Sequence, residues 1–515
     1  MWQDVQDQVG CFQILSILSI LSVYVFWCNR GAMEQSDDRL PPPQRDDRLN
    51  RMMTRVGAAP LRLNNALALL RNGPATYADW LAAIGQARRW VHLENYIFKN
   101  DTVGQRFAEA LIERAAAGVQ VRVLYDWFGS LDVPKSFWQK LRQAGVDVRA
   151  ANPILDGAPL DVIQRDHRKL VAIDGVYASV GGVCIAEPWL ARSPVTGLPY
   201  RDTAVRVCGP AVADFERSFA AVWQNAGPPL PLVEQPAVGA GAAAGDIAVR
   251  VIAQEPGRML MLRLLQVILA DAERRIWIAD AYFLALPILR ETLMTAARDG
   301  VDVRILLPAT NDVAVVGLLS RYGYRPLLES GVRIWEYVGL MMHAKTTVVD
   351  GWWSRIGSTN MNITGLLTNW ELDLVAEDRR FGAAMETMYE EDLTHAREIR
   401  LGGAQHHTQP QPERPESAAE RSARRRHPHT RSQTGATVAR VSASLQAAGS
   451  SSLRRDERAV GAVIGAVLFG LSLLCARFPR LIAWPLAAVG AIFGGISLVR
   501  AANPDPPEAS SPDAG

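Results

Sequence analysis

The chain of 515 residues contains very little lysine and has almost no net charge. Five of its 55 basic residues are Lys, the others are Arg, and the formal net charge is +2 at pH 7. A chain so near neutrality has no overall field that attracts nucleic acid, and its central part has no basic patch with interleaved aromatic residues. The five Cys have no CxxC pair and no metal-ligand spacing. We therefore expect no nucleic-acid partner, no metal site and no cofactor.

Two of the scarce lysines occur in a repeated motif. The copies are His343-Ala-Lys345-Thr-Thr-Val-Val-Asp350, followed by Gly357-Ser358-Thr-Asn360, and His167-Arg-Lys169-Leu-Val-Ala-Ile-Asp174, followed by Gly181-Gly182. Both copies read H-x-K-x4-D-x6-G-[S/G]. A single copy is compatible with packed strand histidines, but two copies in one chain are a specific signal of function.

The residue types in this motif suit phosphodiester chemistry. Residues i and i+2 of a strand project from the same face, so each His lies beside its Lys while the apolar residues that follow form a buried strand. Two such strands brought together surround one phosphorus atom with two imidazoles and two ammonium groups. One His attacks phosphorus and the other transfers the proton, while the lysines neutralise the charge that a metal ion would otherwise balance.

This pair of motifs resembles the two-copy HKD motif of the phospholipase D superfamily, and the resemblance spans roughly residues 50–400. The short spacing and the run Tyr200-Arg201-Asp202-Thr203 are most similar to bacterial cardiolipin synthases. The resemblance implies catalytic roles for His167, Lys169, Asp174, His343, Lys345 and Asp350. It implies His167 as the nucleophile and His343 as the acid and base, with both Asp residues holding the polar network of the site.

An internal repeat indicates the fold. Ala-Gly118-Val-Gln-Val-Arg-Val-Leu in one half corresponds to Asp-Gly300-Val-Asp-Val-Arg-Ile-Leu in the other, and strand and helix patterns alternate around both. The pattern begins with a helix predicted at 62–72 that Gly73-Pro74 ends. We expect an α/β fold of two duplicated halves, residues 60–230 and 250–401, each with a mixed sheet flanked by helices. The linker at 231–249 joins them, and the catalytic site lies at their seam.

Further candidate site residues come from similar positions in the two halves. Glu94 and Asp280 each precede a Tyr by two residues, and Tyr96 is a candidate with them. The resemblance implies that Gly182, Ser358 and Asn360 support the substrate.

Glu187 and Glu371 follow their histidines by 20 and 28 residues, and the resemblance implies that acids here orient the catalytic imidazoles. Cys184 stands where the family commonly has Asn, which the second copy keeps at Asn360. Cys184 is either a lost amide donor or a small packed residue.

The flanking segments indicate a membrane. Residues 1–32 contain an apolar run that predicts a membrane helix, unless translation starts at Met33, and residues 33–59 predict a flexible lead-in. Residues 402–457 form a basic linker of disordered composition, and residues 458–500 predict a transmembrane helical hairpin rather than a buried soluble pair. Residues 501–515 form a disordered tail. The run Arg424-Arg-Arg426 is either solubilising or attracted to anionic lipids.

These features together predict a phosphatidyltransferase in the inner (cytoplasmic) membrane, with its catalytic domain on the cytoplasmic side, because the basic linker precedes the hairpin. The expected reaction joins phosphatidylglycerol molecules into cardiolipin. The alternatives are a phospholipase D-type hydrolase and a non-catalytic membrane scaffold, and the sequence leaves the oligomeric state open.

Overall fold

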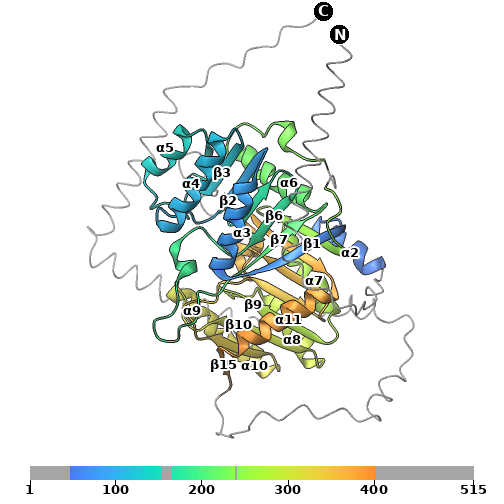
Figure 1. Ribbon diagram of the computed structural model, residues 1–515. Helices are drawn as coiled ribbons and strands as arrows, with labels where there is room; N and C mark the ends of the chain where they lie inside the picture. Colours follow the sequence, from blue (N-terminus) through green and yellow to red (C-terminus); the bar gives the residue numbers. More distant parts are fainter. Residues whose placement is uncertain (1–46, 154–163, 238–240, 402–515) are drawn as a thin grey trace, which may run out of the picture. The chain divides into compact units, whose positions relative to one another are not determined.

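The computed structural model describes residues 47–153, 164–237 and 241–401 (Figure 1). The predicted membrane segments at 1–32 and 458–500 lie outside these residues, as do residues 402–457 and the tail at 501–515. Within the described ranges, the helices are all too short or too polar to cross a bilayer.

The first half contains seven strands and the helices between them. Its strands are β1 (Arg62–Arg71), β2 (Trp90–Asn95), β3 (Gln120–Asp126), β4 (Asp147–Ala151), β5 (Lys169–Ile173), β6 (Tyr177–Gly181) and β7 (Thr203–Cys208). Its helices are α2 (Asp47–Gly57), α3 (Asn72–Gln86), α4 (Thr102–Ala116), α5 (Lys135–Gln143), α6 (Val212–Trp223) and the short 3-10 turns η1 (Glu187–Leu190), η2 (Gln224–Ala226) and η3 (Leu232–Glu234).

The second half repeats this succession and adds one strand. Its strands are β8 (Ile247–Gln254), β9 (Arg275–Ala279), β10 (Asp302–Pro308), β11 (Arg333–Tyr337), β12 (Thr346–Val349), β13 (Trp353–Gly357), β14 (Glu371–Glu377) and β15 (Ala396–Ile399). Its helices are α7 (Leu260–Asp271), α8 (Pro287–Arg298), α9 (Ala314–Tyr322), α10 (Tyr324–Glu329), α11 (Arg379–Leu393) and the π-helical turn η4 (Thr364–Thr368).

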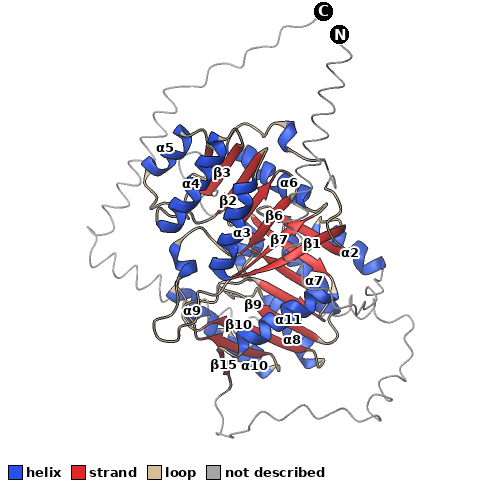
Figure 2. Ribbon diagram, in the orientation of Figure 1, coloured by secondary structure: helices blue, strands red, loops and turns tan. Residues whose placement is uncertain are grey.

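The strands of the described part form one 15-stranded sheet with helices on both faces (Figure 2). From its centre, one half runs β1-β7-β6-β5-β2-β3-β4 and the other runs β8-β14-β13-β12-β9-β10-β11-β15. The two orders match strand for strand, which is the duplication that the sequence predicts. Each half is mixed, because β2, β3 and β4 are parallel, as are β9, β10 and β11, while the remaining pairs are antiparallel.

The halves share a continuous sheet rather than having the separate sheets that we expected. Strand β1 pairs antiparallel with β8, with Arg62 opposite Val249 and Asn65 opposite Ile247. This pairing satisfies backbone groups on strands that would otherwise be exposed edges.

The predicted helix at 62–72 is wrong, because these residues form strand β1. A short apolar run does not distinguish strand from helix by its periodicity, and here pairing with β7 and β8 on both sides decides the conformation. Gly73 and Pro74 lie in the first turn of α3 instead of ending a helix.

The lead-in predicted as flexible over 33–59 contains helix α2. Met53 of α2 is buried, and Arg250 of β8 donates hydrogen bonds to the Thr54 side chain at 2.7 Å and to the Ala59 carbonyl at 2.8 Å. The prediction failed because this helix is stabilised by its contacts with the second half rather than by its own composition.

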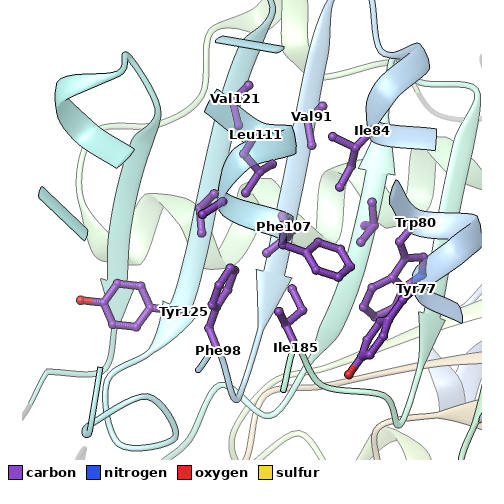
Figure 3. Close-up of a cluster of buried hydrophobic side chains, with 14 of the residues drawn as sticks. Tyr77, Trp80, Ile84, Val91, Phe98, Phe107, Leu111, Val121, Tyr125 and Ile185 are labelled. Atoms are coloured by element: carbon purple, nitrogen blue, oxygen red, sulfur yellow. The ribbon is translucent and has the colours of Figure 1, made fainter. Parts of the chain in front are cut away.

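The core of the first half lies between its sheet and helices α3 and α4. Figure 3 shows Trp80 and Phe107 packed against Val91 and Phe98 of the sheet side, and all four are fully buried. At about 25 cal/mol per Å² of apolar surface, a core of this kind is the main stabilising contribution to each half. It holds the motif strands in a fixed position.

Candidate active site

Each motif begins just before the strand that carries its lysine, and there it is bound to the opposite half. The His167 backbone N–H donates to the Trp370 carbonyl at 3.0 Å, and the His343 N–H donates to the Arg201 carbonyl at 2.7 Å. The neighbouring residues form parallel bridges, Asp166 with Trp370 and Arg201 with Met342. Each motif therefore bonds to the opposite half in the same way.

The imidazoles are oriented by acids from the opposite half. Nδ1 of His167 lies 3.0 Å from both carboxylate oxygens of Glu371, and Nδ1 of His343 lies 2.8 Å from Oδ2 of Asp202. An acid that accepts the Nδ1–H fixes the tautomer and leaves Nε2 free for chemistry. The two acids are equivalent in the sheet. Gly181 of the first motif pairs with Ala204, the corresponding Gly357 of the second motif pairs with Asp373, and each acid lies two residues before that partner.

These acids are themselves held in place. Trp189 Nε1 donates to Asp202 at 2.7 Å, while Ser358 and Asn369 donate to Glu371. Gly182 occupies the position equivalent to Ser358, and a Cβ there would lie 2.2 Å from an Asp202 oxygen. Glycine is thus required beside Asp202, whereas the second half uses the serine hydroxyl as a donor.

Both lysines are buried beside their histidines. Lys345 Nζ donates to the His343 carbonyl at 2.6 Å and lies 3.0 Å from its Nε2, and Lys169 Nζ donates to the His167 carbonyl. Burial, only partly offset by Asp202, lowers the pKa of Lys345 to about 8. The lysines give the site a concentrated positive charge suited to an anionic phosphodiester.

The site shifts the pKa values of the imidazoles and acids. Burial, together with the charges of Lys169, Lys345 and His343, holds the pKa of His167 well below its usual value. Burial and Lys345 also lower the pKa of His343. Burial raises the pKa of Glu371 to about 7.

Asp202 behaves differently from Glu371. Although burial acts to raise the pKa of Asp202, the charge and hydrogen bond of His343 lower it below the usual range. The charge of Asp202 partly offsets the lowering of the His343 pKa by burial, whereas the charges of Lys169, Lys345 and His343 add to the effect of burial on His167.

Aromatic rings line the two histidines. The Tyr96 ring lies edge-on to His167 with 4.9 Å between centroids, and the rings of Trp189 and Tyr282 lie 5.3 and 5.9 Å from His343. The Tyr282 hydroxyl donates to Asp312 at 2.8 Å. These rings limit water around the imidazoles and strengthen electrostatic interactions there.

Asp174 and Asp350 lie at the far ends of the motif strands, contrary to the role that we expected. From His167 to Asp174 the strand spans roughly 20 Å at about 3.3 Å per residue. The Asp174 carboxylate accepts N–H bonds from Arg88, Arg89 and Trp90, each at 2.8 Å, and Asp350 accepts three equivalent bonds. Both residues have positive φ, 55° and 51°, in hairpin turns completed by glycine. They shape the hairpins rather than the polar network around the substrate.

Glu187 does not orient a histidine. It is exposed and accepts the Thr102 N–H at 3.2 Å near the start of α4. Asp202 fills the role that we expected of Glu187. The signal for Asp202 was present in the sequence, because it lies within Tyr200-Arg201-Asp202-Thr203. We chose Glu187 instead because its distance from His167 along the chain is similar to that of Glu371 from His343.

Of the other predicted residues, Asp280 lies near the site and Glu94 does not share its position. In the first half, Asn95 pairs with Lys169. In the second half, Ala279 pairs with Thr346, so the next residue, Asp280, lies at the level of Lys345. Asn95, and not Glu94, is therefore the equivalent of Asp280. Asp280 accepts the N–H groups of Met361 and Tyr282 at 2.9 and 3.0 Å. Glu94 is buried with Arg168, 3.9 Å away.

Asn360 and Cys184 lie at equivalent places after the motifs. The Asn360 side-chain oxygen is buried without a hydrogen-bond partner, whereas Cys184 is a packed thiol within the hydrophobic core of the first half. The structure therefore favours the packing interpretation of Cys184.

Two mixed half-sheets of matching strand order, with each histidine bound to an acid of the opposite half, are the arrangement expected of a phospholipase D-like protein with two motifs. A family model described as "Cardiolipin synthase, PLD-like domain" matches residues 80–191 and 265–393, one segment in each half. The chain belongs to the cardiolipin synthase family, as its motifs predicted.

Known relatives agree with this assignment. Cardiolipin synthase A of Pseudomonas putida is 36% identical over 350 residues, covering 68% of this chain and 73% of the relative. A cardiolipin synthase of Geobacillus kaustophilus is 33% identical over 350 residues, with coverage of 65% and 68%. The solved phosphatidylserine synthase of Haemophilus influenzae matches with a TM-score of 0.56 at 13% identity, covering 68% of this chain and 92% of that one. This last likeness supports the fold.

Proposed function

We propose that this chain is a membrane-bound phosphatidyltransferase that makes cardiolipin and free glycerol from two molecules of phosphatidylglycerol. The observation that carries the proposal is the pair of His–acid couples, His167–Glu371 and His343–Asp202, with a buried lysine beside each histidine. Membership of the cardiolipin synthase family supplies the substrate class.

In the first step, Nε2 of His167 attacks the phosphorus of one phosphatidylglycerol. The P–O bond to the headgroup glycerol breaks, and protonated His343 gives its proton to the leaving oxygen. A phosphatidyl group is then bound to His167 through a P–N bond. Glu371 stabilises the positive charge that develops on the His167 ring.

In the second step, a terminal hydroxyl of a second phosphatidylglycerol approaches phosphorus. Neutral His343 takes the hydroxyl proton as the oxygen attacks, the P–N bond breaks, and His167 returns to its neutral form. The lysines stabilise the non-bridging oxygens in both transition states. The bound phosphodiester, being anionic, raises the imidazole pKa values and so keeps His343 protonated at the start of the cycle.

The membrane location belongs to the same proposal. The apolar segments at 1–32 and 458–500 would anchor the chain in the cytoplasmic membrane with the catalytic halves on the cytoplasmic side. The two segments have the composition of membrane helices, and the linker that precedes the second is basic.

The test uses the purified full chain in phosphatidylglycerol vesicles, with lipid products separated by mass. Cardiolipin and glycerol in equal amounts are expected. Phosphatidic acid with glycerol would instead identify a hydrolase, and no turnover would identify a scaffold. His167→Ala and His343→Ala should each abolish product, and a phosphatidyl adduct should be detectable on His167 after acid-free quenching.

A further inference from the structure

We propose that an apolar rim around the active site docks this chain onto the surface of a phospholipid bilayer. The apolar rim consists of the exposed side chains of Phe128, Leu131, Val195, Leu318, Tyr322 and Ile363. This inference rests on the proposed function and deepens it, because it names the surface through which the lipid substrate reaches the histidines.

In the first half, the rim lies on the loop that follows β3. Phe128 and Leu131 are 56% and 58% exposed, although both are large and apolar. Their loop packs directly against Tyr96, since Ser130 Oγ lies 3.4 Å from the Tyr96 carbonyl. The ring of Tyr96 in turn contacts His167. The loop that carries these two apolar side chains is therefore linked to His167 through Tyr96.

In the second half, the rim lies on α9, which follows the equivalent strand β10. Leu318 and Tyr322, one helical turn apart, are 70% and 59% exposed. The segment leading into α9 is tied to the site, because Asp312 accepts the hydroxyl of Tyr282 and Tyr282 faces His343. The duplication thus places an apolar surface at the corresponding position of both halves.

Two further segments complete the rim. Ile363 follows the second motif, and the neighbouring Asn362 donates to the Tyr282 carbonyl at 3.1 Å. Val195 lies on the loop after Trp189, whose ring contacts His343. All four rim segments are thus linked to a histidine by at most a few residues.

The chemistry of the substrate selects a bilayer as the partner. Each methylene group that moves from a bilayer into water shifts the equilibrium by about fourfold, so lifting two acyl chains out of the membrane is prohibitively unfavourable. The enzyme must instead bring its site to the headgroup. A site with two buried lysines, linked to four segments that expose apolar side chains, fits a phosphodiester at the bilayer surface.

The charges in the four rim segments fit the same partner. Residues 361–369 contain no charged side chain, and Asp132 and Asp312 each have a protein partner. Arg192 is exposed at the edge of the rim, while Arg321 is paired with Glu336 at 2.7 Å. Arginine beside apolar anchors is suited to an anionic lipid such as phosphatidylglycerol.

The experiment compares two substrates in the full chain reconstituted into phosphatidylcholine vesicles. One substrate is long-chain phosphatidylglycerol in the same vesicles, and the other is dihexanoyl phosphatidylglycerol dissolved below its micellar concentration. The rim variants are Phe128→Ser with Leu131→Ser, and Leu318→Ser with Tyr322→Ser. The matched control is Leu232→Ser with Val233→Ser, because these residues are 86% and 67% exposed but lie on η3, within the linker.

We expect each rim variant to lower the ratio of long-chain to short-chain activity by at least about tenfold, while the control keeps the wild-type ratio. Phosphatidylglycerol with a photoreactive group on its acyl chain should also cross-link to residues 127–134 and 309–323 of the wild-type chain. Unchanged ratios in both rim variants, or an active wild type without these cross-links, would overturn the inference.

The cross-linking also separates the two proposals. If the wild type bears the cross-links but forms no cardiolipin from either substrate, the docking surface stands and the proposed function fails. If a rim variant does not fold, the wild-type cross-links alone decide.

Discussion

At the scale of single residues, the asymmetry between the two histidine–acid couples distinguishes their roles. Glu371 is a buried acid with a raised pKa that accepts hydrogen bonds from neutral donors, while Asp202 is kept ionised by His343. Because both motifs have the same His and Lys, the motifs give no sign of this difference. This difference agrees with the proposed roles of His167 as the nucleophile and His343 as the acid.

Replacing Asp202 with Asn should remove the charged group that only accepts, because the amide can also turn its NH2 group toward Nδ1 of His343. We expect Asp202→Asn to lower kcat by about 10³- to 10⁴-fold with little change in KM, because the wrong tautomer then faces the substrate. Steady-state kinetics in vesicles measure both constants. Glu187→Gln is the matched control and should keep near wild-type kcat, and equal losses in the two variants would contradict the assignment of Asp202.

The pH dependence follows from Glu371 and Lys345. The Glu371 carboxylate must be ionised to accept from His167, so kcat/KM should rise with pH through the Glu371 pKa of about 7. Lys345 must also be charged in the substrate complex, where the bound phosphodiester keeps His343 protonated, so kcat should fall as pH rises through the Lys345 pKa of about 8. Lys345→Arg should lose this descending limb of kcat because guanidinium stays charged. A descending limb that persists in this variant would assign it to another group.

At the scale of elements, the motif strand separates two functions that lie close together in the sequence. Its first residues carry the His and Lys of the candidate site, and its last residue, Asp174 or Asp350, closes a hairpin turn by accepting three backbone N–H groups. The His-to-Asp spacing that both motifs share therefore reflects a strand of the same length in each half, with the Asp at the opposite end from the His and Lys.

Asp174→Ala should therefore act on stability. The lost hydrogen bonds and the left-handed backbone at φ 55° together should cost about 2–4 kcal/mol of the free energy of unfolding. Denaturant titration measures this loss. Asp174→Asn keeps an acceptor and tolerates the backbone, so it should cost less. A kcat per folded molecule as low as that of His167→Ala would restore a catalytic role to Asp174.

At the scale of the whole molecule, the two halves form one catalytic unit. Besides the β1–β8 pairing, Arg168 spans the seam and donates to the carbonyls of Ser218, Gln254 and Glu371 at 2.8, 3.1 and 3.2 Å. Because each histidine depends on an acid from the other half, neither half contains a complete couple.

Mixing two inactive full-length variants tests whether the site lies within one chain. His167→Ala and His343→Ala each keep one histidine, and together they should show no recovered cardiolipin synthesis at any ratio. The reason is that both couples form across the seam of a single chain. Recovery toward a quarter of wild-type activity in equal mixtures would show that halves are exchanged between chains.

The sequence by itself determined the family and the duplication, and it singled out the four residues to which we assign the chemistry, His167, Lys169, His343 and Lys345. These features are local, because strand periodicity and residue type specify them within about ten positions. Tertiary structure alone decided that residues 62–71 form a strand, that α2 is ordered, and that Asp202 rather than Glu187 serves His343. Each of these depends on a partner from the other half, and pairing between distant segments outweighs local propensity when both sides of a strand are satisfied.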